Sequence, residues 1–321
     1  MELIRGLHNL RARHRGCVAT VGTFDGVHLG HQDILRRLSA HAARLRLPST
    51  VVSFEPMPRE FIEPARAPPR LTRFRDKFGL LASLGLDRFL VLRFDAELQA
   101  MTAAQFAEGL LNEELGARQL VVGHDFRFGA GGEATAGSLE RSGRAHGFAV
   151  EIVPPVTLFD ERVSSTSVRE ALASGELDRA QSLLGRRYHA TGRVVRGEQL
   201  GRTLGFATAN LRLRWSFPLW GIFAVFAARD GRPALPGVAS VGTRPTVGGQ
   251  EPVLEVHLFD EAEEFYGEHL RVEFVAKLRE ERMFPNLQDM VVQMHEDARQ
   301  AKAALAKAGM TVAAYAAARQ Q

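Results

Sequence analysis

The segment GTFDGVHLGH, residues 22–31, combines three glycines, one acidic residue and two histidines. It follows the apolar run CVATV and precedes apolar residues at helical spacing, so we expect a strand, a loop and a helix. His28 and His31 then lie three positions apart near the first turn, on one face of the helix. The N–H groups and the dipole of a helix N-terminus attract anions, and glycine lets a phosphate come close to the backbone.

Two imidazoles that donate to phosphate oxygens would stabilise the charge that develops during a displacement at phosphorus. The segment therefore predicts a phosphate site in which His28 and His31 are catalytic. The alternative is a pair of surface histidines on a capped helix. The candidate phosphate-binding residues of this segment are Gly22, Thr23, Phe24, Asp25, Gly26 and Gly30.

A second glycine-rich segment, GRVVRGEQLGRTLGFATANL at residues 192–211, lies between two predicted strands. Its glycines, Gly197, Gly201 and Gly205, allow a loop that folds over phosphates with its N–H groups turned inward. Thr208 and Asn210 carry side-chain oxygens, which a hard cation such as Mg²⁺ prefers as ligands. A third stretch, residues 129–137, lacks the strand-to-helix context of a dinucleotide fingerprint, so we expect a mobile loop there.

Strand and helix patterns alternate from residue 17 to about residue 185. The apolar runs CVATVG, STVVSF, RFLVLRF, RQLVVG and FAVEIV have the composition of buried strands. Amphipathic segments lie between them, and one of these begins at Thr102 as a predicted N-cap. Another has an apolar stripe formed by Leu71, Phe74, Phe78 and Leu81. The alternation predicts an α/β fold with a doubly wound parallel sheet, in which ligands bind beyond the carboxyl ends of the strands.

The pattern changes near residue 186. Closely spaced strand segments follow, separated by glycine and proline turns, and LEVHL and LRVEF alternate with period two. This is typical of an antiparallel barrel or sandwich. After Pro285 the apolar residues return to helical spacing, with Leu287, Met290, Val291, Met294 and Ala298 on one side. We therefore expect a first domain at residues 1–185 and a second at residues 186–321, which ends in a helix that covers the strands.

The composition is that of a globular cytoplasmic protein. Of the 321 residues, 45% are hydrophobic and 24% are charged, and a net charge of +4 without a long basic run argues against nucleic-acid binding. The single cysteine, Cys17, excludes an internal disulfide and suits a reducing compartment. The sequence lacks the apolar stretch of a signal peptide and any run of about 18 apolar residues, so we expect no membrane span. It indicates no particular protein partner.

These motifs together resemble a known family. HLGH after the first strand and SSTSVR at residues 164–169 are similar to the two signatures of the nucleotidyltransferase superfamily. Members of this superfamily catalyse an attack on the α-phosphate of a nucleoside triphosphate, which releases pyrophosphate. FEPMPREF, RLTRFRDKF and VGHDFRFG resemble the flavin-specific segments of bacterial FAD synthetases. The likeness continues through the second half, so the chain resembles the bifunctional riboflavin kinase/FAD synthetases. This implies a Rossmann-like nucleotidyltransferase domain followed by a kinase β-barrel with a C-terminal helix.

The resemblance implies roles for individual residues of the first domain. His28 and His31 would contact the phosphates of ATP. The residues implied to hold the triphosphate are Ser164, Ser165, Thr166 and Arg169, for which a plain helix cap is the alternative. The residues implied to bind flavin are Phe54, Pro56, Pro58, Phe61 and Asp125, the last of these near nucleotide or flavin. Family members often carry a basic residue where Ser167 stands, so we assign no role to that position.

In the second half, GFATANL resembles the riboflavin kinase motif GFPTANL, whose threonine and asparagine bind metal and nucleotide. Thr208 and Asn210 occupy those places, and the glycines of the preceding loop are implied to bind ATP. Ala207 replaces the proline, which removes a restraint on φ.

Glu255 matches the family's general base, which takes the proton of the riboflavin 5′-hydroxyl. By alternation it shares a strand face with His257, and an exposed strand carboxylate is the alternative. GVASVGTRPTV and FYGEHLRVEFVAKLREERMF resemble further family segments. Within the latter, Arg271 and Arg279 could either reach the flavin or lie on a solvated face, and we favour the solvated face.

The leading hypothesis is one chain with two consecutive reactions. The barrel would make FMN and ADP from riboflavin and ATP, and the first domain would make FAD and pyrophosphate from FMN and ATP, both with Mg²⁺. One alternative is a monofunctional FMN adenylyltransferase whose kinase domain is weakened by Ala207. The other is a flavin-binding regulator without turnover.

Overall fold

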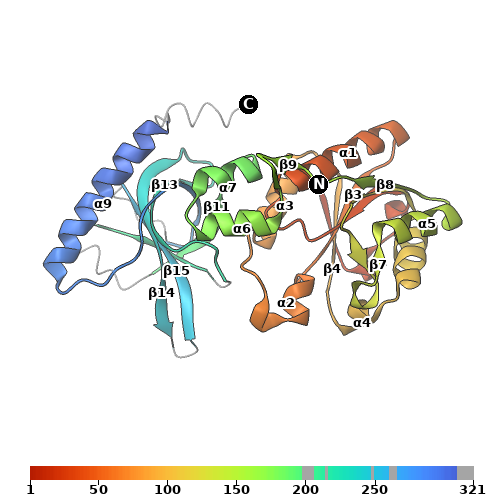
Figure 1. Cartoon of the computed structure of the whole chain (residues 1–321), viewed down its shortest axis with the longest axis horizontal. Helices are drawn as coiled ribbons and strands as arrows, with labels where there is room; N and C mark the ends of the chain where they lie inside the picture. The colour runs from red at the N-terminus through yellow and green to blue at the C-terminus, as the bar shows by residue number, and fades with distance from the viewer. Residues whose placement is uncertain (197–205, 214–215, 247–248, 260–265, 309–321) are drawn as a thin grey trace. The chain divides into compact units, whose positions relative to one another are not determined.

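The computed structural model describes residues 1–196, 206–213, 216–246, 249–259 and 266–308 (Figure 1). The chain divides into two compact units. Met1–Pro68 and Phe74–Ser165 form the first, and Pro69–Arg73 with Thr166–Gln321 form the second. The division at Ser165 lies 20 residues before residue 185, where we predict the domain boundary. The predicted boundary stays a prediction.

The first unit contains a six-stranded parallel sheet with the order β1-β4-β3-β2-β5-β8. Its strands are β1 (Glu2–Arg5), β2 (Cys17–Val21), β3 (Ser49–Phe54), β4 (Arg88–Leu92), β5 (Ala117–Gly123) and β8 (Ala149–Val153). All five predicted strands are present. The prediction missed β1, a short strand at the edge of the sheet, because its four residues include two charged ones.

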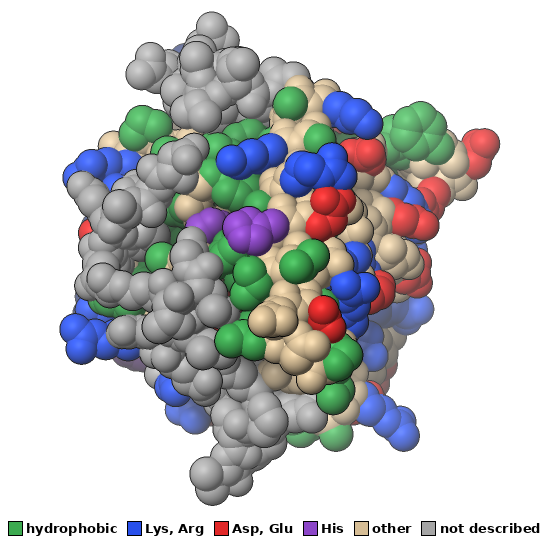
Figure 2. All heavy atoms as spheres, turned by 90° about the vertical axis from the view of Figure 1, so that its left-hand side faces the viewer, with side chains coloured by type: hydrophobic (Ala, Val, Ile, Leu, Met, Phe, Trp, Pro, Cys, Tyr) green, Lys and Arg blue, Asp and Glu red, His purple; other side chains and the backbone are tan. Residues whose placement is uncertain are grey.

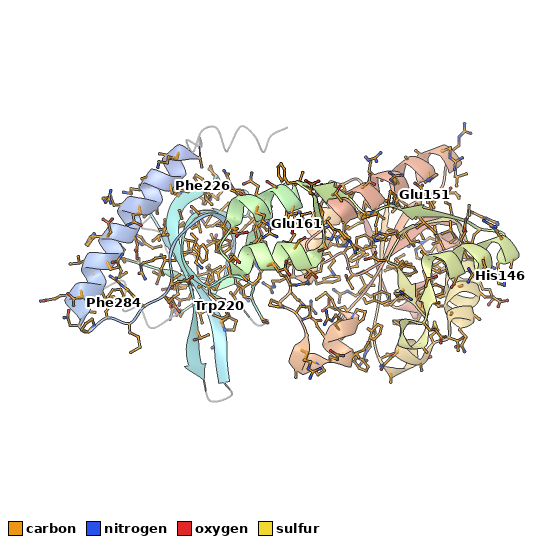
Figure 3. All side chains as sticks on the ribbon, in the orientation of Figure 1. His146, Glu151, Glu161, Trp220, Phe226 and Phe284 are labelled. Atoms are coloured by element: carbon orange, nitrogen blue, oxygen red, sulfur yellow. The ribbon has the colours of Figure 1, made fainter. Side chains whose placement is uncertain are left out.

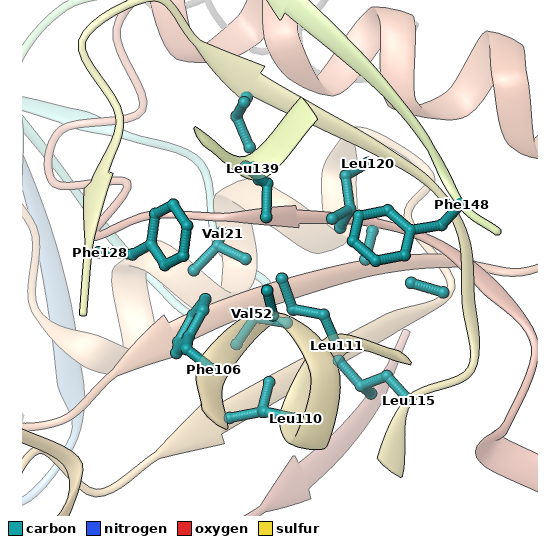
Figure 4. Close-up of a cluster of buried hydrophobic side chains, with 14 of the residues drawn as sticks. Val21, Val52, Phe106, Leu110, Leu111, Leu115, Leu120, Phe128, Leu139 and Phe148 are labelled. Carbon is teal, nitrogen blue, oxygen red and sulfur yellow. The ribbon is translucent and has the colours of Figure 1, made fainter. Parts of the chain in front are cut away.

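Helices cover both faces of this sheet, as the doubly wound prediction requires. Alternate residues of β2 show why, since the side chain of Val18 joins one buried cluster and that of Ala19 joins the other. The first cluster packs against α1 (Leu29–Leu45) and α3 (Phe74–Ser83). The second, shown in Figure 4, packs against η4 (Gln105–Glu114) and α5 (Ala136–His146).

The segment that begins at Thr102 confirms its predicted cap. The Thr102 Oγ1 accepts a hydrogen bond from the N–H of Gln105 at 3.2 Å, and Gln105 Oε1 accepts one from the N–H of Thr102 at 2.9 Å. The helix that follows, η4, is a π-helix, a rarer form than the α-helix that we predict there.

Short elements complete the first unit, and several lie near the predicted site. They are α2 (Pro58–Ile62), α4 (Ala96–Ala100), the hairpin β6 (Arg127–Phe128) with β7 (Ala134–Thr135), the hairpin β9 (Thr157–Leu158) with β10 (Glu161–Arg162), and the 3₁₀ turns η1 (Leu7–Asn9), η2 (Ala12–His14), η3 (Pro64–Arg66) and η5 (Ala130–Gly132).

The second unit contains a closed antiparallel barrel, which decides between the barrel and the sandwich that the strand pattern leaves open. The barrel order is β11-β12-β15-β14-β13-β16. Its strands are β11 (His189–Val195), β12 (Ala209–Arg212), β13 (Gly221–Arg229), β14 (Leu235–Thr246), β15 (Gly249–Leu258) and β16 (His269–Arg279). The helices α6 (Ser165–Ala173), apart from Ser165, and α7 (Leu177–Leu184) belong to the same unit.

The C-terminal helix α9 (Leu287–Lys307) covers one side of the barrel, as predicted (Figure 1). Ala301 and Leu305 of α9 pack with Phe226 of β13 in one buried cluster (Figure 3). Only part of the predicted apolar stripe is covered, because Leu287 at the start of the helix is 49% exposed. Among the described residues, no helix has the length and apolar character needed to cross a bilayer.

Candidate functional site

The loop between β2 and α1 carries the first candidate site, at the carboxyl end of a central strand of the sheet. His28 is the N-cap residue of α1, and its Nδ1 accepts a hydrogen bond from the backbone N–H of His31 at 3.3 Å. A neutral imidazole that accepts at Nδ1 carries its proton on Nε2. His28 therefore has an Nε2–H that can donate to a phosphate oxygen.

The two imidazoles lie together, as their spacing predicts. The rings of His28 and His31 are stacked, with centroids 3.7 Å apart and planes inclined by 19°. The ring of Phe24 lies 5.0 Å from that of His31. His28 is only 6% exposed, so the alternative of two surface histidines is wrong for this residue.

The loop backbone has a conformation that few side chains adopt. Gly26 has a φ of 84°, and its non-glycine neighbours Phe24 and Val27 have φ values of 48° and 44°. Such residues cost about 1–3 kcal/mol each and are concentrated at functional sites. At Gly30, a Cβ atom would lie 3.1 Å from Cε1 of His28, which is tighter than ordinary van der Waals contact, so a side chain here would displace the imidazole slightly. The buried Asp25 and the half-buried Gly22 and Thr23 complete the loop.

The serine-rich segment contacts this loop through Ser165. The Ser165 hydroxyl donates to the carbonyl oxygen of Asp25 at 2.9 Å, and Ser164 is half-buried beside it. Thr166 is exposed, and Arg169 donates from Nε to the carbonyl oxygen of Pro69 at 2.6 Å within the second unit. The structure thus joins Ser165 to the histidine loop and leaves the phosphate roles of the other three as predictions.

A second feature of the first unit is an apolar cavity of about 360 Å³. Two of the predicted flavin residues, Phe54 and Pro58, line it. The remaining lining residues are mostly aromatic or aliphatic: Val21, Ile62, Phe94, Leu98, Gln99, Met101, Phe106, Phe126, Arg127, Phe128, Gly129, Gly131 and Gly132. Aromatic walls of this kind suit a planar ring system.

The other predicted flavin residues are not among those that line this cavity. Phe61 is 39% exposed, and its ring packs against that of Phe94 with centroids 5.9 Å apart. Pro56 follows a cis peptide bond after Glu55. Asp125 is exposed and forms an ion pair with Arg162.

The glycine-rich stretch at residues 129–137 differs from the loop that we predict. It folds into η5, β7 and the start of α5, and three of its glycines line the aromatic cavity. At Gly129, which has a φ of 80°, a Cβ atom would lie 3.0 Å from the backbone nitrogen of Ala103. The sequence signal was the clustering of glycines itself, which indicates a close backbone approach as well as a loop.

Lys77 is a further residue of the first site that sequence analysis missed. It lies on α3, is 2% exposed, and donates from Nζ to the carbonyl oxygen of Thr23 at 2.7 Å. A signal was present, because Lys77 falls between Phe74 and Leu81 on the stripe that we predict to be apolar. A lysine at a core position is rare unless it has a specific partner.

The second candidate site lies on the barrel. Asn210 of β12, Glu255 of β15 and Ser240 of β14 are direct cross-strand partners, so their side chains form a row on one face. Leu254, Val256 and Leu258 are buried on the opposite face, which confirms the predicted alternation of β15. Asn210 is 6% exposed and donates from Nδ2 to the carbonyl oxygen of Thr208 at 3.5 Å.

A cavity of about 270 Å³ opens beside this row. Its polar lining residues are Thr208, Ser240, Glu255, His257, Arg279, Glu281, Arg282 and Asp297, and its apolar ones are Phe206, Ile222, Val238, Ala239, Phe284, Met290 and Met294. Phe284 precedes the first residue of α9 and lies near the N-terminal end of that helix (Figure 3). The barrel and α9 therefore both contribute apolar residues to the cavity, and its charged residues come from the barrel, from the segment after β16 and from α9.

Aromatic and basic side chains gather on this side of the molecule. Figure 2, which looks from the side where α9 lies in Figure 1, shows histidines beside hydrophobic and basic side chains. The Phe206 ring contacts His257 of β15 and His295 of α9, with both centroid distances 4.9 Å. His257 Nδ1 is 2.9 Å from the carbonyl oxygen of Ala207. These contacts hold Phe206 and Ala207 against the barrel.

Arg279 corrects one prediction. We place it on a solvated face, but it lines the cavity and forms two bonds to Asp297 of α9, from Nε at 2.9 Å and from Nη2 at 2.7 Å. Asp297 is 3% exposed. Period-two alternation could not reveal this partner, because Asp297 lies 18 residues away on a helix.

Glu281 is a second acid in the cavity that the sequence analysis missed. Burial and the negative charge of Glu255 raise the pKa of its carboxyl above the ordinary value. Its carboxylate packs against Gly242 at a point where any Cβ atom would overlap it. Of the three carboxyl groups that line this cavity, Glu255 and Glu281 thus interact with each other, as paired acids do in sites that handle protons.

The predicted metal ligands occupy suitable places, with Thr208 half-buried on the cavity wall and Asn210 buried beside it. Within the described ranges no group of three or more histidine, cysteine, aspartate or glutamate side chains is arranged to hold a metal ion. The predicted loop residues Gly197, Gly201 and Gly205 lie outside the described residues.

Comparison with known proteins covers both units. A family model described as FAD synthetase matches residues 10–167, and one described as riboflavin kinase matches residues 184–305. The bifunctional riboflavin kinase/FMN adenylyltransferase of Escherichia coli K12 is 45% identical over 299 residues, which are 92% of this chain and 96% of that protein. The chain belongs to this family.

Further relatives agree. The bifunctional riboflavin kinase/FMN adenylyltransferase of Pseudomonas fluorescens is 47% identical over 94% of this chain and 97% of its own. A solved structure from Streptococcus pneumoniae, titled a macrolide-efflux protein, is 29% identical, with a TM-score of 0.80 over 92% of this chain and 97% of that one. The fold of the family thus extends over nearly the whole chain, and the parallel sheet and the closed barrel correspond to its two matched models.

Proposed function

We propose that this chain catalyses two consecutive reactions of flavin cofactor synthesis. At the barrel, the 5′-hydroxyl of riboflavin attacks the γ-phosphorus of ATP, and FMN and ADP form. At the histidine loop, a phosphate oxygen of FMN attacks the α-phosphorus of a second ATP, and FAD and pyrophosphate form. Membership of the family of bifunctional riboflavin kinase/FMN adenylyltransferases supports both reactions.

The stacked pair His28 and His31 carries the adenylyl-transfer half of the proposal. Their imidazoles lie at the N-terminus of α1, where the helix dipole and the N–H donors also favour an anion. As the α-phosphorus is attacked, negative charge grows on its oxygens and on the departing pyrophosphate. Fixed N–H donors at that point stabilise the transition state more than the ground state.

The aromatic cavity is the place that we assign to the flavin ring of FMN. Phe54 at the end of β3 and Phe128 of β6 present rings to it, and β2, which leads into the histidine loop, contributes Val21. The cavity and the loop are thus connected through the end of one strand. This arrangement would let the FMN phosphate extend from the cavity toward the bound triphosphate.

At the barrel, Glu255 is proposed as the general base. It lies in the cavity with an apolar wall that suits the riboflavin ring, and its strand partner is Asn210. Phosphoryl transfer needs little covalent help from the protein, so position and charge neutralisation are its main requirements. Glu255 would accept the proton of the 5′-hydroxyl as the oxygen attacks the γ-phosphorus.

We propose Mg²⁺ and ATP as the cosubstrate pair at both sites. Thr208 and Asn210 would hold the ion at the barrel through side-chain oxygens, since hard oxygen donors and few protein ligands suit Mg²⁺. When bound, Mg²⁺ neutralises phosphate charge. We further propose that the enzyme acts in the cytoplasm, which its buried, unpaired Cys17 supports.

A monofunctional adenylyltransferase is the second candidate, because Ala207 replaces the family proline. One contact favours a working kinase: His257 lies within hydrogen-bond distance of the Ala207 carbonyl oxygen and ties down the segment that the proline would have stiffened. We therefore retain the kinase activity in the proposal.

A product time course tests the proposal. Purified protein is incubated with riboflavin, ATP and Mg²⁺, and flavins and pyrophosphate are measured in parallel. The proposal predicts FMN, then FAD with an equal amount of pyrophosphate. FAD from supplied FMN but no FMN from riboflavin would support the monofunctional enzyme, and flavin binding without any turnover would support the regulator.

A further inference from the structure

The segment at residues 206–208 leads into the barrel strand β12, and it contains the proposed metal ligand Thr208. The pairing of β12 with its neighbours begins at Ala209, so Thr208 stands just outside the regular ladder. Ala207 replaces the family proline, so the residue before Thr208 has no ring that restricts φ. The place of Thr208 on the cavity wall therefore depends on contacts from other elements.

Phe206 makes the first of these contacts. Its side chain is 5% exposed, and its ring contacts His257 of β15 and His295 of α9, with both centroid distances 4.9 Å. The ring planes are inclined by 56° and 68°, close to the edge-to-face arrangement that aromatic pairs favour. The residue that begins the segment is thus held by a strand and by the C-terminal helix.

Two consecutive carbonyl oxygens of the segment accept hydrogen bonds from side chains of the barrel. Nδ1 of His257 donates to Ala207 at 2.9 Å, and Nδ2 of Asn210 donates to Thr208 at 3.5 Å. A carbonyl oxygen can only accept, so Nδ1 of His257 carries the proton of the first bond. Because each peptide unit is planar, these bonds restrain the peptide planes on both sides of Thr208, and with them the direction of its side chain.

His257 also stands on the strand that carries the proposed general base. It follows Glu255 by two residues, which is roughly 7 Å along a strand, and both side chains line the same cavity. The bond from His257 to Ala207 therefore connects the segment that contains Thr208 to the strand that contains Glu255. One strand thus sets the positions of the base and of the metal-binding segment.

His295 separates a positioning role from direct contact with a substrate. It lies on α9, is exposed, and is not among the described residues that line the cavity. We therefore expect any effect of His295 on the kinase reaction to pass through the Phe206 ring that it contacts.

We propose that Phe206, His257 and His295, here called the Phe206 cluster, position Thr208 for the Mg²⁺ and ATP of the kinase reaction and take the place of the family proline. The inference rests on the proposed function of the barrel site. His257 and His295 are positioning residues, and the proton transfer stays with Glu255. Adenylyl transfer does not depend on the cluster.

Four substitutions separate the parts of the Phe206 cluster. His257→Ala removes a ring and a hydrogen bond, His257→Asn keeps a donor near the place of Nδ1, and His295→Ala removes the contact from α9. Ala207→Pro restores the restraint on φ, and it is tested alone and combined with each of the others. Lys302→Ala is the matched control, because Lys302 is an exposed residue of α9 whose Nζ lies 4.8 Å from the centroid of another ring, that of Phe259.

Each protein is measured in two ways. The first is steady-state kinetics: KM for ATP, KM for riboflavin and kcat are measured for FMN formation, with FAD formation from supplied FMN as the control reaction. The second is amide hydrogen exchange of residues 208–213 in protein without nucleotide or metal, which reports the local stability of the segment independently of activity.

We expect His257→Ala to raise KM for ATP in FMN formation by roughly tenfold, and His257→Asn and His295→Ala by roughly threefold each. Combined with Ala207→Pro, each increase should shrink to less than about twofold, because the proline supplies the lost restraint. KM for riboflavin should change less than KM for ATP. FAD formation in every variant, and all constants of Lys302→Ala, should stay within about twofold of wild type.

Amide exchange should follow the same order. Residues 208–213 should exchange faster in His257→Ala and His295→Ala than in wild type, and more slowly again when Ala207→Pro is added. Lys302→Ala should exchange like wild type. Agreement between exchange without ligand and KM for ATP would connect the order of the segment to nucleotide binding.

Three results would overturn the proposal. The first is a rise in KM for ATP that Ala207→Pro does not reduce, because the histidines would then contact a substrate directly. The second is a lower Tm with unchanged KM for ATP and unchanged amide exchange, because the cluster would then serve packing alone. The third is a raised KM for ATP in Ala207→Pro by itself, because the proline and the cluster would then hold different conformations.

The remaining outcomes also decide the question. Should His257→Ala not fold, His257→Asn and the exposed His295→Ala provide the test. Should wild type form no FMN from riboflavin and ATP, the proposed kinase function fails. Amide exchange without ligand still tests the Phe206 cluster in that case, and unchanged exchange in His295→Ala would overturn it.

Discussion

The two candidate sites of this chain are built in different ways. The histidine loop is continuous in sequence, and three of its carbonyl oxygens accept hydrogen bonds from side chains of α3, α6 and α1. The barrel site is dispersed, since Asn210, Glu255 and Ser240 come from three strands and meet only through their register. A contiguous site depends on loop conformation, whereas a dispersed site depends on side chains presented by a rigid sheet.

This difference predicts how substitutions act. At the loop, each group stands on the same backbone, so effects should be shared and hard to separate. At the barrel, each side chain stands on a strand whose position is fixed by the sheet, so single functional groups can be removed cleanly.

The largest expected effect is at the barrel. Glu255→Gln keeps the shape of the side chain and removes the base, so FMN formation should fall by about 10²–10⁴-fold. FAD formation from supplied FMN should stay within about twofold of wild type. Initial rates with riboflavin and with FMN measure the two activities. The matched control is Glu280→Gln, because Glu280 is an exposed glutamate that pairs with Lys277. Equal loss of both rates would refute the separation of the sites.

The next effect is at the loop. His31→Ala removes one imidazole of the stacked pair and should reduce FAD formation from FMN by about 10²–10³-fold, the usual effect of losing one donor to a developing oxyanion. FMN formation from riboflavin should persist. His8→Ala, an exposed histidine of the same unit, controls for the loss of an imidazole as such. A normal rate of FAD formation in His31→Ala would rule out the proposed role.

A smaller effect is expected at the aromatic cavity. Phe54→Ala removes a lining ring and should raise KM for FMN by roughly tenfold, as the loss of one ring contact does. Phe61→Ala, at an exposed position beside Phe94, should raise it by less than about threefold. Steady-state kinetics at saturating ATP measure both values. If the two variants were alike, the cavity would not hold the flavin ring.

The loop site was the easier one to predict from sequence, because a strand, three glycines and two histidines are consecutive. The same analysis could not find Lys77, whose partner Thr23 lies 54 residues earlier in the chain. It also misjudged residues 129–137, since glycine clusters are equally typical of loops and of cavity walls. A local sequence pattern indicates where the backbone has an unusual conformation, but it does not identify the residues that pack against that segment.

At the barrel, the alternation of β15 was enough to place Glu255 and His257 on one face. The strand pattern could not show that α9 completes the cavity, so Arg279 was assigned to solvent although Asp297 of the helix holds it. The contribution of Glu281 was also hidden, because its raised pKa depends on burial and on Glu255, which is distant in sequence. Tertiary partners decide these roles.

The smallest effect concerns stability. Because the pKa of Glu281 is raised in the folded protein, the folded state binds a proton more tightly than the unfolded state, and the free energy of unfolding falls as pH rises through that pKa. Glu281→Gln should therefore raise Tm at neutral pH and leave it nearly unchanged below the ordinary pKa of a glutamate. Calorimetry of wild type and Glu281→Gln between about pH 4 and pH 8 measures the difference in Tm. A larger gain at acid pH would contradict the assignment.

The most direct test of two separate sites is the fate of labelled ATP. With riboflavin, wild type should transfer label from the γ-phosphorus to FMN and retain it in FAD, whereas label from the α-phosphorus should enter FAD only. Folded His31→Ala should transfer only the γ-label, and folded Glu255→Gln supplied with FMN only the α-label. Loss of both transfers through either single substitution, or α-label in FMN, would contradict the account.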